Sequence, residues 1–245
     1  LFASVVRVAA IEFHKMINVY KNVYAFITPS EFLKKKLALN GFDEKRIHCI
    51  PTFTASKTTI GEPQIGSYGL YFGRVTEEKG VETVIKAYEK LPEYTVKIMG
   101  DDTTDEAKRL KKYVKDHKMK NVEFLGFKSG EELEDIIKGA RFTLIPSIWY
   151  DNLPNTALES FQYSKPVIAS NIGSLPELVS DGENGYLFEP SNVEDLIKKI
   201  KMLDDDILVK KMGQASRKRL ENRFAPQSHY EALMKIFNEA VKNRK

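Results

Sequence analysis

Cysteine, histidine and tryptophan are all scarce in this chain, whose 245 residues include one cysteine, four histidines and one tryptophan. The lone Cys49 cannot form an internal disulfide bond or a thiolate metal cluster, and so little cysteine is typical of a reducing compartment. The histidines are scattered and lack the spacing of metal ligands. We therefore expect a cytoplasmic protein without a metal centre.

Several motifs that would assign a function directly are also missing. The chain has neither the G-x-G-x-x-G sequence of dinucleotide-binding folds nor the G-x-x-x-x-G-K-[ST] sequence of P-loop enzymes. No Ser-His-Asp or Cys-His arrangement can be argued from the sequence. Neighbouring acids at 101–102 and 204–206 resemble metal ligands, but we interpret them as helix caps or solvated residues. The net charge of +4 does not indicate a nucleic-acid-binding protein.

The chain has no hydrophobic run long enough to span a membrane. Its first residues, LFASVVRVAAIEF, are apolar, but Glu12, His14 and Lys15 interrupt the run and no basic stretch precedes it. An amphipathic helix explains this segment better than a signal peptide. Because the chain opens within this helix and without an initiator Met, we expect it to be the later part of a longer protein.

The remaining sequence alternates apolar strands with helical patterns. The strands are continuous apolar runs, which is typical of a parallel sheet covered by helices on both faces. We therefore predict an α/β fold with a Rossmann-like parallel sheet. A polar segment with Gly and Pro but no periodicity, 54–66, marks a boundary. The expected strands are 23–28, 47–53, 67–73, 94–100, 121–127, 141–147, 166–170 and 185–190.

Ligands of such sheets bind beyond the carboxyl ends of the strands, so the loops after the strands are the candidate sites. In FGRVTEEKG, Arg74 and Lys79 are placed to bind a diphosphate, the first as a planar fork and the second as a point charge. Gly73 and Gly80 would let the backbone approach a ligand closely. The alternative is that both cations are ordinary solvated side chains.

The stretch DNLPNTALES, residues 151–160, opens another helix after a strand. We expect Pro154 in the first helical turn, which would leave the amides of Asn155, Thr156 and Ala157 free to bind an anion. The residue before this turn, Leu153, belongs to the same candidate binding site, the mouth at the start of this helix.

Two acids, Asp151 and Glu159, flank this helix start. Helical side chains lean toward the N-terminus, so the carboxylate of Glu159 can reach the mouth and accept hydrogen bonds from sugar hydroxyls beside a phosphate. The alternatives are that Glu159 only complements the helix dipole and that Asp151 is a turn residue. A third loop, SNIGSLPELVSDGENGYLF, contains Gly173 and Glu177 and either lies over a ligand or is a plain connection.

In this order, GRVTEEKG, NVEFLGF, the two acids separated by seven residues and KPVIASNIGSLPELVSDGENGYLF resemble the retaining glycosyltransferases of family 4. The resemblance covers residues 22–245 and implies the GT-B fold, in which two Rossmann-like domains face each other across a cleft. It implies the end of the N-terminal, acceptor-side domain in 1–53 and a linker in 54–66. The donor-binding domain would then be 67–225, and 226–245 a helix that crosses back to the first domain.

The resemblance implies a role for each candidate residue. Arg74 and Lys79 would bind the donor diphosphate, Phe127 would lie beside the nucleobase, Glu159 would hold the ribose and Asp151 would meet the transferred sugar. Asp stands at 151 where the family usually has Glu, and Asn152 and Leu153 replace glycines, which leaves the identity of the sugar open. Together with Asp151, Arg74 and Lys79 are the expected catalytic residues.

The implied activity is transfer of a sugar, with retention, from a UDP- or GDP-linked donor to a glycan or lipid-linked acceptor, without a metal or other cofactor. A nucleotide-sugar epimerase, a phosphorylase and a non-catalytic nucleotide-sugar binding domain are alternatives. Peripheral contact with the inner face of a membrane and self-association are further expected associations, and no nucleic-acid partner is expected.

Overall fold

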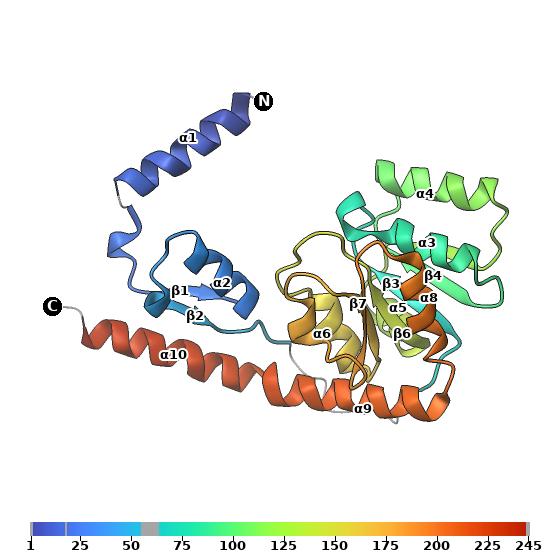
Figure 1. The fold of residues 1–245 in the computed structure, drawn as a ribbon. Coiled ribbons are helices and arrows are strands. Elements are labelled where there is room, and N and C mark those ends of the chain that lie inside the picture. The colour runs from blue at the N-terminus through green and yellow to red at the C-terminus, as the bar shows by residue number, and fades with distance from the viewer. Residues whose placement is uncertain (1, 18, 55–63, 244–245) are drawn as a thin grey trace.

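The computed structural model describes residues 2–17, 19–54 and 64–243. Most of the expected linker, residues 55–63, lies outside this described part of the chain. The main strands are β3 (Tyr68–Phe72), β4 (Thr95–Met99), β5 (Val122–Gly126), β6 (Ala140–Ile145), β7 (Val167–Ser170) and β8 (Gly185–Phe188). They form one parallel six-stranded sheet in the order β5-β4-β3-β6-β7-β8. The predicted Rossmann-like parallel sheet is thereby confirmed (Figure 1).

Helices cover both faces of this sheet, because alternate strand residues point to opposite sides. Tyr71 of β3 packs in a core cluster with α3 (Val81–Glu89), α4 (Asp105–Asp116) and α8 (Val193–Lys201). Leu70 and Phe72, its neighbours in β3, belong to a cluster on the other side. The helices there are α5 (Gly130–Lys138) and α6 (Asn155–Gln162), and α9 (Asp206–Arg223) packs against α6.

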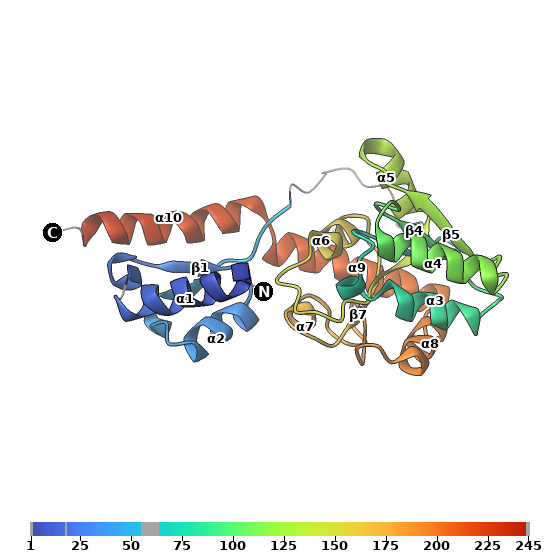
Figure 2. The same cartoon turned by 90° about the horizontal axis from the view of Figure 1, so that it is seen from above.

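A smaller unit lies beside the main sheet. Its strands β1 (Phe26–Thr28) and β2 (Ile47–Cys49) pair in parallel, and α2 (Glu31–Leu39) packs on them. The last helix, α10 (Pro226–Lys242), continues from α9 and runs alongside this unit (Figures 1 and 2). A ring nitrogen of His229 lies 2.7 Å from the carbonyl oxygen of Pro51, and Asn243 donates to the hydroxyl of Tyr24 at 3.0 Å.

Helix α1 (Phe2–Met16) projects from the smaller unit and exposes much of its apolar surface (Figure 1). Val5, Val8 and Ile11 each expose more than half of their area, at 59%, 60% and 53%. In the described part of the chain, no helix is both long and apolar enough to cross a membrane. The remaining short helices are the single turns Val19–Asn22, Glu44–Arg46 and Glu77–Lys79, together with α7 (Leu175–Leu178).

Candidate functional site

Two adjoining cavities open at the carboxyl edge of the main sheet. The first has a volume of about 420 Å³ and the second about 340 Å³, and they share Phe72, Gly73, Arg74 and Thr156 in their walls. Ten of the site residues expected from the sequence line at least one of them. The first cavity includes Gly73, Arg74, Lys79, Asp151, Leu153, Pro154, Asn155 and Thr156, and the second includes Phe127 and Glu159.

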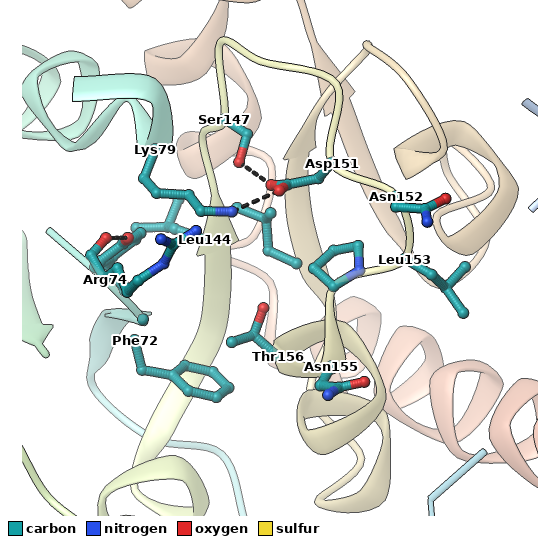
Figure 3. Close-up of a pocket in the computed structure, with 14 residues that line it drawn as sticks. Phe72, Arg74, Lys79, Leu144, Ser147, Asp151, Asn152, Leu153, Asn155 and Thr156 are labelled. Atoms are coloured by element: carbon teal, nitrogen blue, oxygen red, sulfur yellow. Dashed lines mark hydrogen bonds and ion pairs between the residues drawn. The ribbon is translucent and has the colours of Figure 1, made fainter. Parts of the chain in front are cut away.

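An ion pair forms one wall of the first cavity. The amine of Lys79 lies 2.5 Å from Oδ1 of Asp151, and Oδ2 of Asp151 accepts a hydrogen bond from the hydroxyl of Ser147 (Figure 3). The side chains of Lys79 and Asp151 are only 19% and 16% exposed. This partial burial and the double anchoring fix the direction of the carboxylate. Two of the three ammonium donors of Lys79 stay available for a ligand anion.

The loop that carries Lys79 is held against the loop after β6 by backbone contacts. Gly80 has a φ of +67°, and a Cβ at this position would lie 2.1 Å from the carbonyl oxygen of Pro146. The amide of Ile148 donates to the carbonyl of Glu78 at 3.0 Å. Gly80 therefore permits a close approach between two loops of the protein, and its role in admitting a ligand to the backbone stays a prediction.

Arg74 faces the same cavity from β3. Its side chain is exposed, and within the described residues its guanidinium has no ion-pair partner within bonding distance. Its backbone carbonyl accepts a hydrogen bond from the buried hydroxyl of Tyr71, whose pKa is raised by burial and, to a smaller extent, by Asp151. Gly73, with a φ of +147°, turns the chain out of the strand at this point. The free guanidinium can bind a phosphate in a bidentate manner.

The start of α6 differs in two details from the sequence-based expectation. The helix begins at Asn155, so Pro154 is the residue before the first turn rather than within it. The amide of Ala157 donates to the carbonyl of Pro154 at 3.1 Å and is not available to an anion. The amides of Asn155 and Thr156 remain, because the first residues of a helix have no carbonyl partner within it.

Glu159 stands in contrasting surroundings on the next turn of α6. Its half-buried carboxylate makes no hydrogen bond or ion pair with any described residue, and burial raises its pKa. Thr156, one turn earlier, lines both cavities and connects the two. The rest of the second cavity includes apolar walls from Met99, Leu133 and Phe127, whose ring is 75% exposed. Unpaired acid and exposed ring therefore share one apolar pocket.

The third loop does not lie over either cavity wall described above. Its Ser174 donates to the carbonyl of Asp151 at 2.7 Å, and its Glu177 binds the first amides of α2. The ring of Tyr150 packs on Phe32 at a centroid distance of 5.0 Å, so packing explains Tyr150. This loop is therefore more than a plain connection between two elements, because it also makes a contact between the two units.

Some residues of the site were not expected from the sequence. Ser147, which is 1% exposed at the end of β6, orients Asp151, and Asp101 and Lys128 line the second cavity. All three follow strands, so the rule that ligands bind at the carboxyl edge could have included them. Among the described residues, no group of three or more His, Cys, Asp or Glu is placed to hold a metal ion.

The geometry defines a class of site. One cavity combines cations, free helix amides and an oriented carboxylate, and the other combines an apolar ring with an unpaired acid. Amides and cations suit phosphates, carboxylates suit sugar hydroxyls, and an exposed aromatic ring suits a planar base.

A comparison with known protein families supports this assignment of the site. The family described as "Glycosyl transferases group 1" matches residues 56–219, which is more than half of the chain. The protein therefore belongs to this glycosyltransferase family.

Individual relatives are similar to this chain over part of their length. An uncharacterized glycosyltransferase of Methanocaldococcus jannaschii is 30% identical over 174 residues, which cover 71% of this chain and 48% of the relative. A glycogen synthase of Mycobacterium tuberculosis H37Rv is 28% identical over 212 residues, or 84% of this chain and 49% of that enzyme. The chain thus spans about half the length of these curated relatives.

Solved structures share the fold of this chain. One from Rickettsia africae superposes with a TM-score of 0.83 at 22% identity, covering 92% of this chain and 67% of its own. HepE of Anabaena, solved in complex with UDP and glucose, gives 0.78 at 19% identity over 88% of this chain and 63% of its own. These similarities establish the GT-B-type α/β arrangement.

Proposed function

We propose that this chain is the donor-binding part of a retaining glycosyltransferase of family 4, which transfers a sugar from a nucleotide-sugar to a glycan or lipid-linked acceptor. The observation that carries the proposal is the pair of adjoining cavities. Arg74, Lys79 and the start of α6 surround the first, and Glu159 stands unpaired in the second. The complex of HepE with UDP and glucose supports a UDP-linked donor, and GDP is the other candidate.

Each residue has a defined task in this proposal. The diphosphate lies between Arg74, Lys79 and the amides of Asn155 and Thr156, where donors are already aimed at the charge that develops on the leaving group. The two cations neutralise the negative charge of the leaving diphosphate, which a metal ion would otherwise neutralise. Asp151 accepts hydrogen bonds from the hydroxyls of the transferred sugar, with its direction set by its bonds to the protein.

The nucleoside occupies the second cavity. Phe127 stacks on the base, and the carboxylate of Glu159 accepts hydrogen bonds from the ribose hydroxyls. Such bonds replace the water that a half-buried, unpaired carboxylate holds in the free protein.

Calorimetry with a panel of nucleoside diphosphates and their sugar conjugates tests the proposal. We expect one diphosphate to bind clearly better than its nucleoside, and its sugar conjugate to bind as well. Absence of binding across the panel would contradict the proposal. Transfer of radiolabelled sugar to added acceptors then separates a transferase from a binding domain, and interconversion of free nucleotide-sugar without an acceptor would identify an epimerase instead.

Positioning of the acceptor supplies roughly 7–11 kcal/mol of the barrier in reactions of two bound partners. The chain spans about half the length of its relatives, and the proposal assigns both cavities described above to the donor. We therefore expect this chain alone to bind the nucleotide-sugar and to transfer sugar very slowly, and fast turnover on an added acceptor would contradict this.

A further inference from the structure

A carboxylate of the larger unit caps a helix of the smaller unit. Glu177, on α7 of the larger unit, accepts hydrogen bonds from the first two amides of α2 on the smaller unit. The amide of Phe32 lies 2.6 Å from Oε1 and the amide of Glu31 lies 2.9 Å from Oε2. The third amide, of Leu33, is capped by the hydroxyl of Ser30 at 3.2 Å. All three free amides of the first turn of α2 are therefore satisfied, two of them by a residue about 145 positions away in the sequence.

A second set of contacts joins α2 to the loop that carries Asp151. Ser30 donates from its hydroxyl to the side-chain oxygen of Asn152 at 3.1 Å. Phe32 packs on Tyr150, and the amine of Lys36 lies 5.1 Å from the centroid of the Tyr150 ring. The two residues that flank Asp151 in the sequence are thus both held by α2.

The same α7 also holds Asp151 directly. Ser174, immediately before α7, donates to the carbonyl of Asp151 from its hydroxyl at 2.7 Å and from its amide at 3.4 Å. Behind α7, Arg219 and Arg223 of α9 donate to the carbonyl of Glu177 at 2.7 and 3.1 Å. Glu177 is therefore fixed from one side by the core helix α9 and bonded on the other side to α2.

We propose that Glu177 is a positioning residue for the donor sugar: by capping α2 it holds that helix against residues 150 and 152, and so fixes the loop that aims Asp151 into the donor cavity. The carboxylate of Glu177 does not touch the donor. It acts through α2, and an anionic cap at a helix N-terminus is favoured by the helix dipole. This proposal rests on the proposed function, because it assumes that the sugar of a nucleotide-sugar meets Asp151.

The contact also gives the smaller unit a role in donor binding. Without Glu177, the first turn of α2 loses two charge-assisted hydrogen bonds. The packing of α2 against Tyr150 and Asn152 is then less stable. The phosphate-binding groups Arg74 and Lys79 do not contact α2. Because Lys79 pairs with Asp151, loss of the cap should weaken recognition of the sugar more than recognition of the diphosphate.

The test compares Glu177→Gln with Glu183→Gln, an exposed glutamate six positions further along that removes the same charge. Calorimetry gives the affinities of each variant for UDP-glucose and for UDP. We expect the ratio of the two affinities to fall by about 2- to 30-fold in Glu177→Gln, the usual range for coupling through packed contacts, and to be unchanged in Glu183→Gln. Ser174→Ala, which keeps all charges but loses one bond to Asp151, should lower the same ratio.

Hydrogen exchange supplies a readout that does not need a ligand. The amides of residues 31 and 32 should exchange faster in Glu177→Gln at an unchanged melting temperature. An unchanged affinity ratio, or an equal loss for UDP and UDP-glucose, would overturn the inference. If the unaltered chain bound neither UDP nor GDP nor their sugar conjugates, the proposed function itself would fail, which is a distinct result.

Discussion

Glu159 offers the sharpest test of the donor site, because its two interpretations predict different effects of Glu159→Ala. One predicts a loss of nucleotide affinity, and the other predicts a lower melting temperature. As a ligand for the ribose, its carboxylate accepts one or two hydrogen bonds from hydroxyls. As a helix-dipole partner, it only stabilises α6. The structure weakens the second interpretation, since α6 begins at Asn155 and Glu159 lies beyond the first turn, where the dipole effect fades.

The magnitude follows from the surroundings of the carboxylate. A hydrogen bond to a charged group contributes about 1.5–3 kcal/mol. Because the second cavity is open to water, a ribose hydroxyl left without Glu159 is partly rehydrated, so we expect Glu159→Ala to lose the value of one such bond. That corresponds to an increase in the Kd for the nucleotide of about 10- to 150-fold.

The free protein should respond differently. Burial raises the pKa of Glu159, so the folded state holds its proton more tightly than the unfolded state does. The contribution of this group to stability is therefore present at low pH and is lost as pH rises through its folded pKa. Above its folded pKa, where the unpaired carboxylate is ionised, Glu159→Ala should leave the melting temperature unchanged or raise it.

Calorimetry and thermal unfolding of Glu159→Ala check both statements. The control is Glu221→Ala, which removes an exposed helical glutamate that pairs with Arg217 and should change neither quantity appreciably. Unchanged nucleotide affinity together with a lower melting temperature would refute the reasoning and leave Glu159 as a structural residue.

Three further predictions concern other residues. Arg74→Ala and Lys79→Ala should each lower the affinity for a nucleoside diphosphate far more than for the bare nucleoside, and equal losses in calorimetry would show that neither meets the phosphates. Lys165 is buried and donates to three backbone carbonyls at 2.6–2.7 Å, so Lys165→Met should lower the free energy of unfolding by about 3 kcal/mol or more in urea titrations. Because burial lowers the pKa of Lys165 to about 8, its protonated form is disfavoured in the folded state, so stability should rise from pH 8 toward the ordinary pKa of 10.5, and Lys165→Met should lack this rise. Val8→Lys, on the exposed apolar face of α1, should reduce any self-association seen by light scattering, and an unaltered mass for a self-associating chain would exclude α1 as the contact.

Much of the fold could be predicted because each strand and helix carries a local signal. The apolar strands and the 3.6-residue periodicity of the helices depend only on neighbouring residues, and a parallel sheet buried on both faces needs both. The carboxyl edge of such a sheet gathers loops far apart in the sequence, which is why Arg74 and Glu159 could be assigned to one region in advance. Phe127 was assigned to that region through the family resemblance.

The features of the site that could not be predicted from the sequence depend on contacts between distant segments. The close approach of Gly80 to the carbonyl of Pro146 was not expected, because no local pattern pairs those two loops. The same holds for Glu177, whose carboxylate binds amides about 145 residues away. Sequence alone showed that Ala157 lies in the first turn, but not that its amide would bond to Pro154.

The two acids of the site show what these distant contacts achieve. Asp151 is ion-paired with Lys79 and bonded to Ser147, so its direction is set before any ligand arrives. Glu159 has no partner among the described residues, so a ligand that supplies hydroxyl donors improves its surroundings. In the proposed function, the acid that meets the transferred sugar is thus held by the protein, whereas the acid that binds the ribose is left for the ligand to satisfy. Because the bonds that hold Asp151 come from three separate loops, the backbone contacts at Gly80, Ile148 and Ser174 are as much part of the site as the side chains that line it.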